Sequence, residues 1–237
     1  MNRFWNNIIK PIFIKENIKT IIEIGIDKGK NTTKLIDYCL MNGGKLISID
    51  PKPVINVNLL EEKYKFFRCI KDLSLNALPT IKNFDAVLID GDHNWYTVFN
   101  ELKIIEKNSL IYKKFPLVFL HDTEWPYARR DMYYLPETIP SNFRKPYAKK
   151  GIIAGQSELK DPKRELGKKL INSHLNNALF EGGEKNGVLT AIEDFIKSSS
   201  VPLSFCKIPT NNGLGILFQK NRQLESFIEG LTKTLKQ

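Results

Sequence analysis

Two apolar segments of the chain each end in aspartate and histidine. Residues 84–93 read FDAVLIDGDH, and residues 116–123 read PLVFLHDT. A continuous apolar run of this length is typical of a strand that is buried on both faces of a parallel sheet. In open α/β sheets, ligands bind at the carboxyl ends of such strands. We therefore expect five side chains to converge on one cleft: Asp90, Asp92, His93, His121 and Asp122.

β-like runs alternate with helical periodicity from residue 20 to about 125. The predicted strands are 20–25, 45–50, 65–70, 85–90 and 116–121. The predicted helices are 31–41, 56–64, 73–82 and 94–107. This alternation implies right-handed βαβ units and a doubly wound parallel sheet. After a helix at 187–198, the sequence predicts an antiparallel hairpin across the turn TNNG and a closing amphipathic helix that extends to Leu235.

The pattern fails between residues 125 and 186, where prolines and glycines recur and no clean strand is expected. Such a stretch inside a compact domain indicates a functional insertion. We expect residues 1–237 to form a single domain, with 125–186 as a lid that binds an acceptor.

Composition limits the class of protein, its compartment and its binding partners. The chain is 42% hydrophobic and 26% charged, as in soluble globular proteins, and no apolar stretch is long enough for a membrane span. The first residues make a poor signal peptide, and the three isolated cysteines favour a reducing cytoplasm. The formal net charge is +10, and the segment from Arg129 to Lys169 has eleven Lys/Arg against five Asp/Glu. This excess suits nucleic acid or an anionic small molecule, or it is an ordinary solvated surface.

A glycine loop follows the first predicted strand in IIEIGIDKGKNT, residues 21–32. Gly25 and Gly29 let the backbone turn and approach a ligand closely. A dinucleotide site would need glycine where Asp27 stands, and Glu23 precedes the loop, so a pyrophosphate is disfavoured. Asp50 ends the second strand, where a carboxylate can bind two ribose hydroxyls. The pattern favours a cationic, phosphate-free nucleoside, S-adenosyl-L-methionine (SAM), while a glycine turn without a ligand is the alternative.

These motifs resemble the class I SAM-dependent methyltransferases. E-x-G-x-x-x-G-x-x-T is similar to their first motif, and FDAVLIDGDHNWYTVFNEL is similar to a motif of the "methyltransferase domain 24" branch. That branch includes macrolide-sugar O-methyltransferases and cephalosporin-hydroxylase-like relatives. The resemblance covers residues 20 to about 220 and implies a Rossmann-like, mostly parallel sheet with a C-terminal antiparallel hairpin and a lid insertion.

The resemblance also implies roles for single residues. Glu23, Gly25 and Gly29 would line the methionine end of SAM, and Asp50 would bind its ribose. Asp72 would lie near the adenine, or would only cap a helix.

At the predicted cleft, Asp90 matches a magnesium-binding carboxylate, and His93 matches a general base, with Asp92 or a backbone group holding its far nitrogen. Metal-dependent members have an acidic pair where this chain has His121 and Asp122. A divalent ion, Mg²⁺ or Mn²⁺, bound by Asp90, His121 and Asp122 is expected, although an imidazole suits magnesium poorly. The alternative is that Asp122 only anchors a loop.

The predicted lid mixes aromatic and basic residues, which stack on rings and bind anions. The candidate acceptor-binding residues are Trp125, Tyr127, Arg129, Arg130, Tyr133 and Tyr134. The alternative is a lid with its own small aromatic core.

The leading hypothesis is an O-methyltransferase that acts on a hydroxyl of a saccharide or natural product, with an acceptor that is a small molecule or glycan and carries negative charge. A nucleic-acid methyltransferase and a non-catalytic protein of the same fold are the alternatives. Nucleic acid is the less favoured partner because no separate nucleic-acid-binding domain is evident, and a homo-oligomer is compatible with the sequence.

Overall fold

A seven-stranded sheet forms the centre of the computed structural model, which describes residues 1–165 and 169–234. The strand order is β3-β2-β1-β4-β5-β10-β9. The first five strands in the chain are parallel, namely β1 (Thr20–Ile24), β2 (Lys45–Ile49), β3 (Phe67–Ile70), β4 (Ala86–Ile89) and β5 (Leu117–His121). The hairpin of β9 (Leu203–Ile208) and β10 (Leu214–Gln219) is antiparallel and pairs with β5 through β10. The predicted doubly wound, mostly parallel sheet is therefore confirmed.

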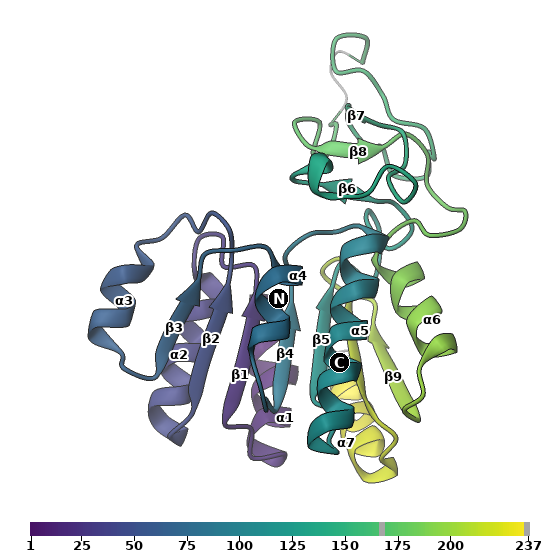
Figure 1. Ribbon diagram of the computed structural model, residues 1–237. Helices are drawn as coiled ribbons and strands as arrows, with labels where there is room; N and C mark the ends of the chain where they lie inside the picture. Colours follow the sequence, from purple (N-terminus) through teal and green to yellow (C-terminus); the bar gives the residue numbers. More distant parts are fainter. Residues whose placement is uncertain (166–168, 235–237) are drawn as a thin grey trace.

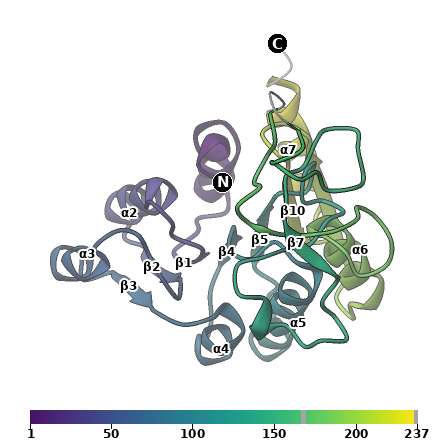
Figure 2. The same ribbon diagram turned by 90° about the horizontal axis from the view of Figure 1, so that it is seen from above.

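Helices cover both faces of the sheet (Figures 1 and 2). One face carries α2 (Lys30–Asn42), α7 (Arg222–Thr234) and an N-terminal helical segment that ends in α1 (Lys10–Lys15). The other face carries α4 (Ser74–Ala77), α5 (Trp95–Tyr112) and α6 (Val188–Ser198). The helix α3 (Val57–Lys63) lies beside β3 at the edge of the sheet (Figure 1).

Burial on both faces explains the continuous apolar runs. Along β1, Ile21 packs into the core under α2 and the N-terminal segment, whereas Ile22 packs into the core under α5. In the same way Leu88 and Val87 of β4 enter opposite cores. Because side chains alternate between the faces of a strand, two apolar cores require an unbroken apolar sequence.

Three element predictions need correction. The predicted helix 73–82 is only one α-helical turn, α4, followed by a 3₁₀ turn at Leu78–Thr80, since Pro79 lacks the N–H that would continue the α-helix. The helix predicted at 94–107 extends to Tyr112. No element was predicted before residue 20, but 2–15 is helical. The closing helix is present, and Leu235 lies outside the described residues.

The segment between β5 and α6 stands above the carboxyl ends of the parallel strands as a lid (Figure 1). It contains a three-stranded sheet in the order β6-β8-β7, where no clean strand was expected. The strands are β6 (Met132–Tyr133), β8 (Asn176–Ala178) and β7 (Tyr147–Lys149). They are too short for a periodic pattern to be visible in the sequence. Among the described residues, no helix has the length and apolar character needed to cross a membrane.

Candidate active site

A cavity of about 570 Å³ opens at the carboxyl ends of β1, β2 and β4, beneath the lid. Apolar side chains of Ile24, Ile49 and Leu73 form part of its wall on the sheet side. The lid contributes Tyr134, Leu135, Thr138 and Ile139. The cavity therefore lies where open α/β sheets bind their ligands, and the lid forms one part of its wall.

The glycine loop crosses directly over the end of β4. Gly25 has a φ of +90°, and a Cβ at this position would lie 2.3 Å from the carbonyl oxygen of Asp90. Gly29 has a φ of +70° and precedes the first residue of α2. Gly25 lines the cavity, so its backbone is open to a ligand as the sequence predicts.

Glu23 lies behind this loop and does not line the cavity formed by the described residues. Its carboxylate accepts hydrogen bonds from Asn31 Nδ2 at 2.9 Å and Ser48 Oγ at 2.8 Å. Burial raises the pKa of Glu23 to about 7, although these hydrogen bonds oppose the shift. The position suits a residue that ties the start of α2 to β2.

We expect Glu23→Gln to change the pH dependence of stability. Glu23 has a higher pKa in the folded than in the unfolded chain, so its contribution to stability decreases as pH rises from about 4.5 to about 7. Glutamine keeps an acceptor for Asn31 and has no charge to bury. Urea unfolding at pH 5 and pH 8 gives the free energy of unfolding of both proteins. From pH 5 to pH 8, the stability of the variant relative to wild type should rise by roughly 3 kcal/mol. Parallel pH profiles for the two proteins would contradict the raised pKa.

Asp50 lines the cavity at the end of β2. Its Oδ2 accepts the backbone N–H groups of Ile26 at 2.8 Å and Asp27 at 3.2 Å, and its Oδ1 accepts that of Lys52 at 2.8 Å. These bonds fix the carboxylate at the rim of the glycine loop, use both acceptor sites of Oδ2 and leave one acceptor site on Oδ1.

Asp72 lies outside the cavity wall, although the next three residues, 73–75, belong to it. Its Oδ1 accepts from the backbone N–H of Leu73 and from Asn76 Nδ2. These bonds tie Asp72 to the start of α4, but the N-cap residue of that helix is Leu73 and no side-chain hydrogen bond caps it, so the alternative prediction of a capping Asp72 is wrong.

The cavity wall is acidic. Its charged side chains are four aspartates and one lysine: Asp27, Asp50, Asp90, Asp92 and Lys52. A wall of this composition attracts a cation and disfavours a phosphate.

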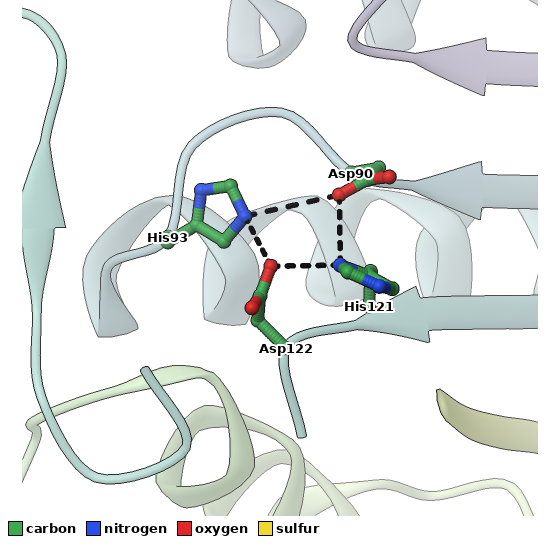
Figure 3. Close-up of side chains that lie close together, drawn as sticks. All are labelled: Asp90, His93, His121 and Asp122. Carbon is green, nitrogen blue, oxygen red and sulfur yellow. Dashed lines mark hydrogen bonds and ion pairs between the residues drawn. The ribbon is translucent and has the colours of Figure 1, made fainter. Parts of the chain in front are cut away.

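Four side chains meet at the end of the cavity beside β4 and β5. The ligand atoms of Asp90, His93, His121 and Asp122 all lie within 4.8 Å of one another. His93 Nε2 is 2.6 Å from Asp122 Oδ2 and 3.8 Å from Asp90 Oδ1. His121 Nδ1 is 2.8 Å from Asp122 Oδ2 and 3.2 Å from Asp90 Oδ1. Figure 3 shows the closed ring that these contacts make, which we call the His–Asp centre.

The backbone of Asp122 explains how two consecutive residues face the same centre. Neighbouring residues of a strand point to opposite faces. β5 ends at His121, and Asp122 has a φ of +58°, in the left-handed region. This turn brings the Asp122 carboxylate back beside the His121 ring. A non-glycine residue in this conformation costs about 1–2 kcal/mol, and such strain is concentrated at functional sites.

Electrostatics couples the four groups. Burial alone would lower the pKa of His93, but the carboxylates of Asp122 and Asp90 raise it well above the ordinary value. The same balance raises the pKa of His121 to about 9. Burial alone would raise the pKa of Asp122, but the two imidazoles hold it well below its usual range. In the absence of another cation, the two histidines therefore carry the protons that balance the carboxylates.

Asp92 does not hold the far nitrogen of His93, and this expectation is wrong. Asp92 instead accepts hydrogen bonds from Asn94, Thr97 and the backbone N–H of His93. The buried Nδ1 of His93 has no hydrogen-bond partner among the described residues. The Nε2 atom is the one that points into the His–Asp centre (Figure 3).

Of the six residues predicted to bind an acceptor, only Tyr134 lines the cavity made by the described residues. Tyr133 and Arg130 are fully buried in the lid. The Tyr133 hydroxyl donates to Asp131, and Arg130 donates to the carbonyl oxygen of Ala178. Both side chains hold the lid together, as the alternative prediction of a lid core expects.

The remaining three predicted acceptor residues also have partners inside the protein. The Tyr127 hydroxyl donates to Asn177, and its ring lies 5.5 Å from the His93 ring. Arg129 makes two hydrogen bonds, at 2.6 and 2.7 Å, to the Glu193 carboxylate of α6. Trp125 packs against the small apolar cluster of the lid.

Sequence reasoning missed several residues near the cavity. Glu101 of α5 is fully buried, and neither of its carboxylate oxygens has a hydrogen-bond partner within the described ranges. Burial raises its pKa to about 8. The sequence analysis singled out Asp72 in the segment KDLSL, but the cavity is lined by the three residues that follow it: Leu73, Ser74 and Leu75. The only sequence signal for Glu101 was a charge on the apolar face of a helix.

Comparison with known proteins supports the fold. No family model matches the chain, and no curated protein matches it. The SAH-bound methyltransferase PaMTH1 from Podospora anserina is similar in structure, with a TM-score of 0.50 and 14% identity over 89% of this chain and 76% of that one. The 1,6-didemethyltoxoflavin-N1-methyltransferase from Burkholderia thailandensis is similar with a TM-score of 0.48 and 12% identity, over 90% of this chain and 76% of that one.

At these identities the likeness to the Podospora protein establishes the fold. The chain has a Rossmann-like fold of the methyltransferase type, with an antiparallel hairpin closing a parallel sheet. The narrower branch, with its macrolide-sugar and cephalosporin-hydroxylase-like members, stays a prediction.

Proposed function

We propose that the protein is a SAM-dependent O-methyltransferase that acts on a hydroxyl group of a saccharide or natural product. The observation that carries the proposal is the acidic, lid-covered cavity at the carboxyl ends of β1, β2 and β4, with the His–Asp centre at one end. The similarity in fold to an SAH-bound methyltransferase supports it.

The residues of the cavity fit SAM. Asp50 offers carboxylate oxygens to the ribose hydroxyls, and the apolar side chains of Ile49, Leu73 and Leu75 offer a surface for the adenine. The excess of aspartates suits the positive charges of the sulfonium and amino groups. When bound, SAM supplies an electrophilic methyl group.

Asp90 connects the two parts of the site, because it lines the cavity and belongs to the His–Asp centre. An acceptor hydroxyl beside Asp90 would therefore lie between the cofactor cavity and this centre. Alignment of the hydroxyl oxygen with the methyl carbon is the main contribution that the protein can make to such a displacement. Tyr134, Leu135 and Thr138 of the lid line the same cavity.

Proton removal from the acceptor is assigned to the His–Asp centre. His93 was predicted to be the general base, and it can take a proton only when its own Nε2 is unprotonated. A divalent cation held by Asp90, His121 and Asp122 would displace protons from the imidazoles and would act as a Lewis acid on a nearby hydroxyl. The four side chains fit a cation because two carboxylates and two imidazoles converge, with one donor atom of each within 4.8 Å of the others.

The acceptor class follows from the lid. Arg129 and Arg130 are engaged within the protein, but the lid also carries exposed cationic side chains at Lys149, Lys163 and Arg164. We propose an acceptor whose reacting hydroxyl enters the acidic cavity and whose negative charge, as on a phosphorylated or carboxylated sugar, lies outside that cavity against cationic side chains of the lid. A methyl-transfer screen over nucleotide sugars, acidic glycans, neutral glycans and RNA tests this class, and methylation of RNA alone would contradict it.

We expect Asp50→Ala to weaken the binding of S-adenosylhomocysteine by roughly a hundredfold, because a charge-assisted hydrogen bond from the ribose is lost and the loop N–H groups of Ile26 and Asp27 lose their acceptor. Isothermal titration calorimetry measures the change. Asp72→Ala is the matched control, since Asp72 ends the next strand but lies outside the cavity wall, and its affinity should stay within a fewfold of wild type. Preference of the wild-type protein for NAD over S-adenosylhomocysteine would contradict the proposed cofactor.

A further inference from the structure

We infer that the His–Asp centre is a four-ligand site for a divalent transition metal, with His93 as a ligand, and that it discriminates against Mg²⁺. The inference names the metal class for the proposed function, and it rests on that function only for the use of the metal in catalysis. It departs from the sequence prediction in two ways, since His93 becomes a ligand and magnesium is no longer a favoured ion.

The spacing of the four donor atoms supports a single shared ion. Adjacent donors around the ring are between 2.6 and 3.8 Å apart, and all four lie within 4.8 Å of one another. Ligands about 2.0–2.1 Å from a tetrahedral ion stand roughly 3.3 Å apart. The four adjacent pairs lie within about 0.7 Å of this separation, and the two diagonal pairs, at up to 4.8 Å, would close by up to about 1.5 Å if all four donors bound a tetrahedral ion.

The donor types select the metal. Mg²⁺ is bound through oxygen in octahedral geometry and usually keeps several waters. The His–Asp centre offers two oxygens from Asp90 and Asp122 and two nitrogens from His93 and His121, and imidazole nitrogen suits Fe²⁺, Co²⁺, Ni²⁺ and Zn²⁺ far better than it suits Mg²⁺.

The exposed fractions of the four side chains show that the His–Asp centre is open on the side of Asp90. The side chains of His93 and Asp122 are 10% and 7% exposed, and that of His121 is 17% exposed, whereas that of Asp90 is 29% exposed and lines the cavity. Metal sites that act in catalysis keep an open position toward the substrate. The open side here faces the cavity that is proposed to hold the cofactor and acceptor.

The surroundings hold the ligands in place. The Phe4 ring packs edge-on against His121, and the Tyr127 ring packs against His93. The left-handed backbone of Asp122 is the strained feature that turns its carboxylate toward both imidazoles. On the far side of Asp90, the Met1 amino group is 2.9 Å from Oδ2, which leaves Oδ1 as the oxygen that faces the imidazoles.

Titration of the chelator-stripped full chain with Co²⁺ tests the inference without any measurement of activity. We expect one Co²⁺ per chain and intense visible absorption from a site with nitrogen ligands and low coordination number. Zn²⁺ and Ni²⁺ should displace Co²⁺ at concentrations roughly a hundredfold or more below those of Mg²⁺. Failure to bind Co²⁺, or displacement by Mg²⁺ as readily as by Zn²⁺, would overturn the inference.

Variants identify the ligands. His93→Ala and His121→Ala should each weaken Co²⁺ binding by at least roughly a hundredfold, the upper range for loss of a supporting group at a metal site. His174→Ala is the matched control, because His174 is the third histidine of the chain and is exposed in the lid. Circular dichroism checks that each variant is folded, and His93→Gln and His121→Asp provide replacements of similar polarity if an alanine variant is not. His121→Asp should reduce the preference of the site for Co²⁺ over Mg²⁺. An unchanged Co²⁺ affinity in both His93 variants would show that His93 is not a ligand.

Binding of S-adenosylhomocysteine to the same preparations separates the two proposals. A protein that binds S-adenosylhomocysteine but no Co²⁺ would overturn the metal site and leave the proposed methyl transfer standing. A protein that binds Co²⁺ but no S-adenosylhomocysteine would overturn the proposed cofactor and keep the metal site.

Discussion

Gly25→Ala is expected to destabilise the folded protein by about 2–5 kcal/mol and to abolish binding of S-adenosylhomocysteine. An added Cβ would lie 2.3 Å from the carbonyl oxygen of Asp90 and 2.9 Å from the Cα of Gly91, both of which are backbone atoms. The φ of +90° adds about 1–2 kcal/mol of strain for an L-residue, and overpacking adds about 1–3 kcal/mol. To relieve the clash, the glycine loop must move away from the end of β4, and Asp50 would lose the N–H groups that hold it at the loop.

Gly43→Ala is the control that separates backbone strain from the clash. Gly43 ends α2 with a φ of +63°, and a Cβ there would meet nothing within 4 Å. This variant should lose only about 1 kcal/mol and keep full affinity for S-adenosylhomocysteine. Urea unfolding and calorimetry of the two variants give the comparison, and equal effects on stability would show that the close approach of the loop to β4 is unimportant.

The sheet could be predicted from the sequence because the apolar pattern of each strand lies within a few consecutive residues. Runs such as 85–90 and 116–121 are apolar on both faces, and this pattern has few other solutions in a soluble α/β chain. The aspartates and histidines that follow these runs necessarily reach the same edge of the sheet. The convergence of Asp90, His93, His121 and Asp122 is therefore the part of the site that sequence reasoning located best.

The N-terminal segment was missed because polar residues interrupt it. Its buried side chains include Phe4, Ile8 and Phe13, which repeat at roughly helical spacing, but asparagine, lysine and Pro11 hide the period. The segment starts with 3₁₀ and π turns rather than regular helix, so the usual pattern with a period of 3.6 residues does not apply to it.

The roles of the lid side chains could not be predicted from the composition of the segment. Arg130 was an attractive contact for an anion, yet its guanidinium binds the carbonyl of Ala178, 48 residues further along the chain. Tyr133 and Tyr134 are adjacent, and one is fully buried while the other lines the cavity. Such differences depend on long-range pairing between β6 and β8, and a two-residue strand leaves no signal from which that pairing can be predicted.

His93→Ala is expected to lower turnover by roughly a hundredfold or more while the affinity for S-adenosylhomocysteine stays near that of wild type. The ring of His93 points its Nε2 atom into the His–Asp centre, 2.6 Å from Asp122, and His93 does not line the cavity that is proposed to hold the cofactor. Loss of the ring therefore removes proton transfer, or the ligand that supports it, without removing a cofactor contact.

Single-turnover methyl transfer with a saturating acceptor measures this effect, and it requires the acceptor that the screen identifies. His174→Ala should retain full turnover, because His174 is exposed and distant in sequence from both strand ends. If His93→Ala kept near-full turnover, the proton would have to leave through another group of the centre, and His121, which contacts both Asp90 and Asp122, would be the next residue to replace. If turnover and cofactor affinity fell together, His93 would instead be needed to hold the end of β4 in place, and the catalytic assignment would be wrong.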